Sequence, residues 1–193
     1  LMHRFATQSG ENGAAFRDDL ERFLELFETR GYETPTSFIF PKAYMAHFDV
    51  LADLGFRCYR GPESKWFERI PGAAVRGFLR LADERFCCTP RVLQPRTDAA
   101  GLSVVPSSQF YSGFLRVGPH VPVRSRVAKA LKGLHRAAER GGIFHLWTHP
   151  FNLGVRTTEL LAGLERILRE ADDLRTAGKL EILPMAAIAE RCQ

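Results

Sequence analysis

The spacing of apolar residues predicts a chain in which helices alternate with short strands. In "GAAFRDDLERFLELFETR" apolar residues recur every three or four positions, which predicts a helix over residues 13–30 with one apolar face. The same spacing predicts helices over 46–54, 71–86, 124–140, 158–176 and 185–192. Short apolar runs predict strands at 36–41, 56–60, 102–105, 143–149 and 179–184.

These strands are continuous apolar runs, and several helices before or between them end at a glycine. That pattern is typical of a parallel sheet covered by helices, so the sequence predicts one α/β domain spanning residues 1–193. A (β/α) barrel and a doubly wound sheet both fit. In either fold, functional groups gather at the carboxyl ends of the strands, where Pro41 and His149 stand.

Composition and charge narrow the function classes. The chain is 45% hydrophobic and 25% charged, which is typical of a globular protein, and no apolar run is long enough to span a bilayer. The net charge is +5, but the basic residues alternate with acids and form no tract, so we expect no nucleic-acid partner. The four cysteines have neither zinc-site nor redox-motif spacing. Compartment and oligomeric state are left open.

The stretch "IFHLWTHP" carries the candidate chemistry. Side chains alternate across a strand, so Trp147 and His149 share a face with His145, while Leu146 points to the other. His149 precedes Pro150, which keeps it extended at the strand tip. A histidine in that position can exchange protons with a substrate, whereas His145 reads as a hydrogen-bonded core residue. Trp147 fits either core packing or a platform for a sugar ring.

Four segments in order, "SFIFP", "LADLGFRCYRG", "VPSSQF" and "GGIFHLWTHPFNLG", resemble the NodB-like polysaccharide deacetylases of carbohydrate esterase family 4. The resemblance runs over nearly the whole chain and implies the C-terminal part of a deformed (β/α) barrel. "LWTH" is similar to the family's late Leu-x-x-His motif. By that likeness His149 is the general acid that protonates the departing amine, and Leu146 helps to wall the acetyl pocket.

The opening "LMH" resembles the end of the family's His-Ser/Thr-x-x-His motif, which makes His3 a metal ligand. The resemblance implies that the first metal histidine and an Asp-Asp motif, holding a metal ligand and the catalytic base, precede Leu1. Neither "RDDLE" nor "ADDLR" replaces that motif, because both lie in predicted amphipathic helices. We therefore expect a divalent metal, with zinc suited to such ligands, and no activity from residues 1–193 alone.

Two family motifs are altered. In place of Arg-x-Pro-Tyr the chain keeps Pro41 but has Ile39 at the arginine position and Lys42 at the tyrosine position, where it could supply a positive charge. The Asp-x-x-Asp-Trp element is reduced to Trp66 in "PESKW". These departures resemble a divergent branch. By the resemblance, the substrate-binding residues are Pro41, Lys42, Trp66, Leu146 and Trp147.

The sequence thus predicts a metal-dependent hydrolase that removes N-acetyl groups from a sugar or polysaccharide. The alternative is a non-catalytic relative that binds carbohydrate through Trp66, Trp147 and Phe151. A third possibility, an unrelated α/β-barrel hydrolase, needs a pair of catalytic carboxylates, for which Glu63 is the one candidate with an irregular setting near a strand end.

Overall fold

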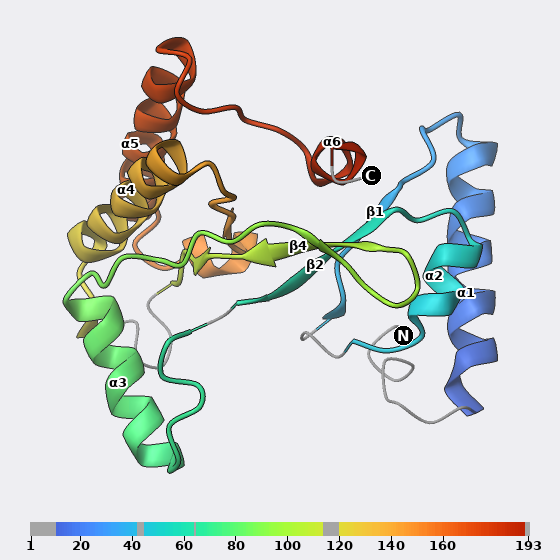
Figure 1. Ribbon diagram of the computed structural model, residues 1–193, viewed down its shortest axis with the longest axis horizontal. Helices are drawn as coiled ribbons and strands as arrows, with labels where there is room; N and C mark the ends of the chain where they lie inside the picture. The colour runs from blue at the N-terminus through green and yellow to red at the C-terminus, as the bar shows by residue number, and fades with distance from the viewer. Residues whose placement is uncertain (1–10, 42–44, 64, 114–119, 192–193) are drawn as a thin grey trace. The chain divides into compact units, whose positions relative to one another are not determined.

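The computed structural model describes residues 11–41, 45–63, 65–113 and 120–191, and it is a mixed α/β structure (Figure 1). The chain divides into two compact units. The first unit consists of residues 1–62, 95–105 and 183–193, and the second of residues 63–94 and 106–182. Each unit has its own hydrophobic cluster, so each is described by itself.

The first unit is built on a four-stranded sheet of order β1-β2-β4-β3. Strands β1 and β2 are parallel, with Ser37 opposite Cys58, and β3 and β4 are antiparallel. Its elements are α1 (Glu11–Thr29), β1 (Ser37–Phe38), α2 (Phe48–Asp53), β2 (Cys58–Glu63), β3 (Arg96–Thr97), β4 (Ser103–Ser107) and α6 (Met185–Glu190), of which β2 and β4 run on into the second unit.

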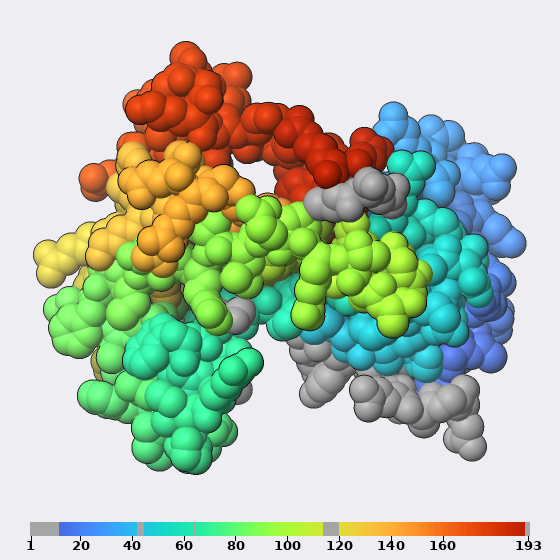
Figure 2. All heavy atoms as spheres, viewed as in Figure 1, coloured from blue at the N-terminus to red at the C-terminus, as the bar shows by residue number. Residues whose placement is uncertain are grey.

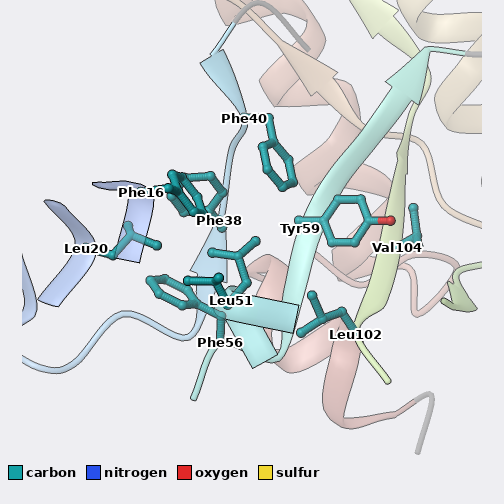
Figure 3. Close-up of a cluster of buried hydrophobic side chains, with 10 residues drawn as sticks. Phe16, Leu20, Phe38, Phe40, Leu51, Phe56, Tyr59, Leu102 and Val104 are labelled. Atoms are coloured by element: carbon teal, nitrogen blue, oxygen red, sulfur yellow. The ribbon is translucent and has the colours of Figure 1, made fainter. Parts of the chain in front are cut away.

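The core of the first unit is rich in aromatic rings (Figure 3). Phe16 and Leu20 of α1 are buried at a spacing of four, which is the spacing that predicted this helix. Phe38 meets Phe16 and Phe40 edge to face, with ring centroids 6.0 and 5.0 Å apart. Edge-to-face pairs of this kind favour a fixed packing beyond the area they bury.

The second unit holds two long helices against a short parallel pair of strands. Helices α4 and α5 pack on each other, and β5 runs parallel to β6. Gly163 lets α5 lie close to Tyr111, because a Cβ at position 163 would lie 2.5 Å from the Tyr111 hydroxyl. The elements are α3 (Ala73–Arg85), β5 (Gln109–Phe110), α4 (Val123–Arg140), β6 (Leu146–Trp147), the 3-10 helix η4 (Pro150–Leu153) and α5 (Thr157–Thr176).

The α/β class and the six predicted helices are confirmed. The strand predicted at 143–149 is shorter, because β6 covers two residues and Ile143 instead forms an isolated bridge with Leu93. The strand predicted at 179–184 is wrong, since that apolar run belongs to no sheet. The described strands form one four-stranded and one two-stranded sheet, without closing into a barrel. None of the helices described has the length and apolar character to cross a membrane.

Candidate functional site

The parallel pair β5–β6 positions the candidate site in the second unit. Gln109 lies opposite Leu146 and Phe110 opposite Trp147. Beyond the pair, the Tyr111 amide donates to the Trp147 carbonyl at 2.8 Å, and the Thr148 hydroxyl donates to the Tyr111 carbonyl at 2.8 Å. Tyr111 is fully buried, so the carboxyl end of β6 is tied to the core of its unit.

His149 follows at the tip of this strand. Its backbone is extended, with φ −108° and ψ 142°, as expected of a residue before proline. Pro150 then begins η4, and the Asn152 amide donates to the His149 carbonyl at 2.9 Å. The turn therefore fixes the backbone of His149 while the side chain stays exposed.

Aromatic rings surround the imidazole. Phe151 stacks on His149 with centroids 5.1 Å apart and planes at 11°, and Trp147 meets it nearly at right angles at 5.4 Å. Phe110 in turn stacks on Trp147 at 4.3 Å. We call these four residues the His149 aromatic cluster. The contacts of the imidazole within the described residues are with these aromatic rings.

The opposite face of the strand packs inward, as the alternation predicted. Leu146 packs against the hydrophobic cluster of the second unit. His145 is half-buried, and its amide donates to the Ser108 hydroxyl at 3.1 Å. Its carbonyl accepts from the amides of Ser108 and Gln109. The backbone of His145 thus supports the strand, while His149 presents its ring at the surface.

Close backbone packing holds the turn after His149. Asn152 is buried, and a Cβ on Gly113 would lie 2.4 Å from the Asn152 carbonyl oxygen. Any side chain at position 113 therefore has to displace η4. In contrast, a Cβ on Gly77, in the middle of α3, meets nothing within 4 Å.

We expect Gly113→Ala to lower the free energy of unfolding by about 1–3 kcal/mol, because the added methyl group is forced into backbone. Gly77→Ala is the control and should be neutral or raise stability by up to about 1 kcal/mol, since alanine favours a helix interior. Urea denaturation of both variants checks this. Equal stability of the two would show that η4 does not pack on Gly113.

The structure brings together two of the predicted site residues, Trp147 and His149, while Leu146 lies on the opposite face of β6 and packs inward. Pro41 is half-buried in the first unit, directly after Phe40 and three residues beyond the end of β1. Lys42 and His3 lie outside the described residues. Trp66 is in the second unit, where its indole N–H donates to a carboxylate oxygen of Asp83 at 2.8 Å, and its ring is 52% exposed.

Within the part of the chain that the structure describes, no three His, Cys, Asp or Glu side chains lie close enough together to hold a metal ion. The predicted ligand His3 falls outside that part of the chain.

A buried group of charged side chains was missed by the sequence analysis. The Lys129 ammonium lies 2.5 Å from Asp83 and 2.8 Å from Glu84, and it is almost fully buried. Lys65 lies 3.6 Å from Glu84 and 3.2 Å from Glu63. We call these five residues the Lys129 ion cluster. It joins the segment after β2 to α3 and α4 and carries three carboxylates against two ammonium groups.

Burial dominates the electrostatics of this cluster. It raises the pKa of Glu63 above the ordinary 4.5, and attraction to Lys65 and Lys129 offsets only part of that effect. For Lys129, burial acts to lower the pKa, but Glu84 and Asp83 together raise it above 10.5. Lys129 is therefore held in its charged form by its two carboxylate partners.

The raised pKa of Glu63 predicts a pH dependence of stability. The folded protein binds the Glu63 proton more tightly than the unfolded protein. The contribution of Glu63 to the free energy of unfolding is therefore fully present below pH 4.5 and is lost as pH rises through the raised pKa. Glu63→Gln removes that loss. The stability of the variant relative to wild type should thus increase as pH rises from 4.5, measured by denaturation at several pH values. A difference that stays constant with pH would contradict this assignment.

Local spacing in the sequence does not reveal this cluster. On α3, Asp83 and Glu84 are buried, while Val75 and Phe78 are exposed. The apolar side of an amphipathic helix is normally expected to face the core, so burial of the acids of α3 is not predicted. The partner Lys129 is 45 residues further on, so its pairing was not readable from local spacing.

A comparison of the chain with protein-family models, with curated proteins and with solved structures found no significant match. The resemblance of the sequence motifs to the polysaccharide deacetylases is therefore not confirmed by a known relative.

Proposed function

We propose that the protein is a metal-dependent hydrolase of the polysaccharide deacetylase type, which removes N-acetyl groups from a sugar or polysaccharide with His149 as general acid. One observation supports this most: His149 is an exposed imidazole at the carboxyl end of a parallel strand pair, and its ring contacts those of Trp147 and Phe151. On this proposal the chain is the C-terminal part of a deformed (β/α) barrel.

The chemistry explains why a fixed acid is needed. Hydrolysis adds water across the amide bond: the carbonyl carbon gains an oxygen, the C–N bond breaks, and the nitrogen leaves with an added proton. An amide nitrogen leaves poorly as an anion, so a proton must reach it as the bond breaks. An imidazolium nitrogen of His149 donates that proton. Stacking on Phe151 favours one orientation of the imidazole plane.

The remaining roles belong to residues around this acid. By the resemblance, Trp147, which shares a face of β6 with His149, would contact the sugar, and Trp66 is the other candidate sugar contact in this unit. His3 would hold the divalent metal, zinc or a similar ion, together with ligands that precede it. That ion would supply an activated water and stabilise the oxyanion.

The test uses the protein translated from the whole reading frame. Purified protein is incubated with N-acetylglucosamine oligomers and other N-acetylated glycans, and free amine and acetate are measured before and after removal of metal with a chelator. We expect equal amounts of the two products, lost on chelation and restored by zinc. Absence of products from every glycan would rule out the deacetylase.

Carbohydrate binding without catalysis is the second candidate, and the exposure of Phe151 favours it. Its ring is 69% exposed although it stacks on His149, so its outer face is open to a sugar ring. Binding alone predicts that glycan affinity falls in Phe151→Ala and that no product forms. The deacetylase predicts turnover by wild type, so product analysis separates the two functions.

A further inference from the structure

Arg126 of α4 is an arginine that the fold encloses completely. Its side chain is 0% exposed and is among the largest of the fully buried side chains described. Helix α4 packs against α5, and Figure 2 shows both helices, in yellow to red, reaching the surface in the face shown. Arg126 is thus enclosed although its helix lies at the surface. A buried charge is costly unless hydrogen bonds compensate it, so the contacts of the guanidinium indicate what it holds in place.

The guanidinium holds the backbone at Gly113. Nη2 of Arg126 donates to the Gly113 carbonyl at 3.2 Å, and Gly113 is itself buried. The carbonyl of Arg126 in turn accepts a hydrogen bond of 3.0 Å from Nε2 of Gln109 in β5. Burial lowers the pKa of the guanidinium from 12.5, and attraction to Tyr111 and Glu84 opposes that effect. Arg126 therefore joins α4 both to β5 and to the segment that follows it.

Segment 111–113 contacts the chain on both sides of His149. On one side it forms two hydrogen bonds with residues 147 and 148, each 2.8 Å long. On the other side, Gly113 packs directly on the backbone of Asn152, whose amide donates to the His149 carbonyl at 2.9 Å. The position of this segment therefore sets the position of the His149 backbone.

We propose that Arg126 is a positioning residue for the general acid: it holds segment 111–113, and that segment holds the turn that carries His149. The inference rests on the proposed deacetylase function. An apolar side chain could fill the same space, but it could not donate to the buried Gly113 carbonyl. Lysine keeps the positive charge but lacks the planar, forked donor group of arginine. We therefore expect Arg126→Lys to move the segment and, with it, the imidazole.

The first measurement needs no activity. In isotope-labelled protein from the whole reading frame, nuclear Overhauser contacts are recorded from the His149 imidazole to the rings of Trp147 and Phe110, whose centroids lie 5.4 and 6.2 Å away. We expect Arg126→Lys to lose these contacts. Arg136→Lys is the matched control, because Arg136 is on the same helix and donates to a backbone carbonyl of another segment at 3.3 Å. The control should keep the contacts.

The second measurement compares steady-state kinetics on an N-acetylated sugar and on 4-nitrophenyl acetate. We expect Arg126→Lys to lower kcat on the amide about tenfold or more, with KM little changed, since a displaced acid no longer reaches the amine. Hydrolysis of the ester should stay near the wild-type rate, because its phenolate leaves without a proton. Arg136→Lys should match wild type on both substrates.

The proposal would be overturned if Arg126→Lys kept the His149 contacts or lost both activities equally. Failure of both Arg126→Lys and Arg126→Gln to fold would overturn it too, because Arg126 would then serve the fold alone. If wild type deacetylates no glycan, the proposed function fails instead. In that case the contacts of His149 in the two lysine variants still decide whether Arg126 positions the imidazole.

Discussion

Lys129→Met should lower the free energy of unfolding by about 3–5 kcal/mol, the cost of leaving buried carboxylates without their counter-charge. The Lys129 side chain is 3% exposed and its ammonium group contacts both Asp83 and Glu84, so water cannot easily take its place. One oxygen of Glu84 is already buried without a hydrogen bond. Removal of Lys129 would take a further hydrogen-bond partner, and the nearest positive charge, from the buried Glu84 carboxylate.

Lys132 is the matched control for this prediction. It lies one turn further along α4 and is exposed, with its ammonium donating to the Cys87 carbonyl at 2.9 Å. Lys132→Met should cost no more than about 1 kcal/mol. A triple variant, D83N/E84Q/K129M, should recover part of the loss, since it removes the uncompensated charges together. Urea denaturation gives all three values, and equal losses for Lys129→Met and Lys132→Met would contradict the burial of the cluster.

His149→Ala should reduce the kcat/KM of deacetylation by about a hundred- to ten-thousand-fold, because the amine then has no positioned acid to protonate it. The side chain is exposed and contacts other rings at the surface, so the fold should persist. Metal content should be unchanged, since on this account the ion binds elsewhere.

His135→Ala is the control for a lost imidazole. His135 is an exposed residue of α4, and its nitrogen lies 3.0 Å from a carboxylate oxygen of Glu170. Its removal should leave deacetylation at the wild-type rate. Steady-state kinetics on one N-acetylated oligosaccharide, with metal analysis of each preparation, compares the variants. Unchanged turnover in His149→Ala would show that His149 is not the general acid.

The helices were predictable because their signal is local. In α1, two of the apolar positions that recur every three or four residues, Phe16 and Leu20, are buried, and Phe16 contacts Phe38 of β1. Strands depend on a partner that periodicity does not name. Residues 179–184 include the apolar Leu180, Ile182 and Leu183, yet they pair with no strand, whereas β6 exists because β5 lies beside it.

The site was partly predictable for the same reason. Strand alternation placed Trp147 and His149 on one face and Leu146 on the other, and their packing agrees. Phe110 escaped prediction, because its stacking on Trp147 depends on the register of a strand 37 residues earlier in the chain. The Lys129 ion cluster escaped too, since a lysine in a helix reads as solvated until its buried partners are known.

General-acid catalysis by His149 is tested most directly by changing the leaving group. Wild type and His149→Ala are compared on an N-acetylated sugar, whose amine must be protonated to leave, and on 4-nitrophenyl acetate, whose phenolate leaves without a proton. We predict a loss of about a hundred- to ten-thousand-fold on the amide and a near-wild-type rate on the ester. Equal losses on both substrates, or no loss on the amide, would contradict the assignment of His149 as the proton donor.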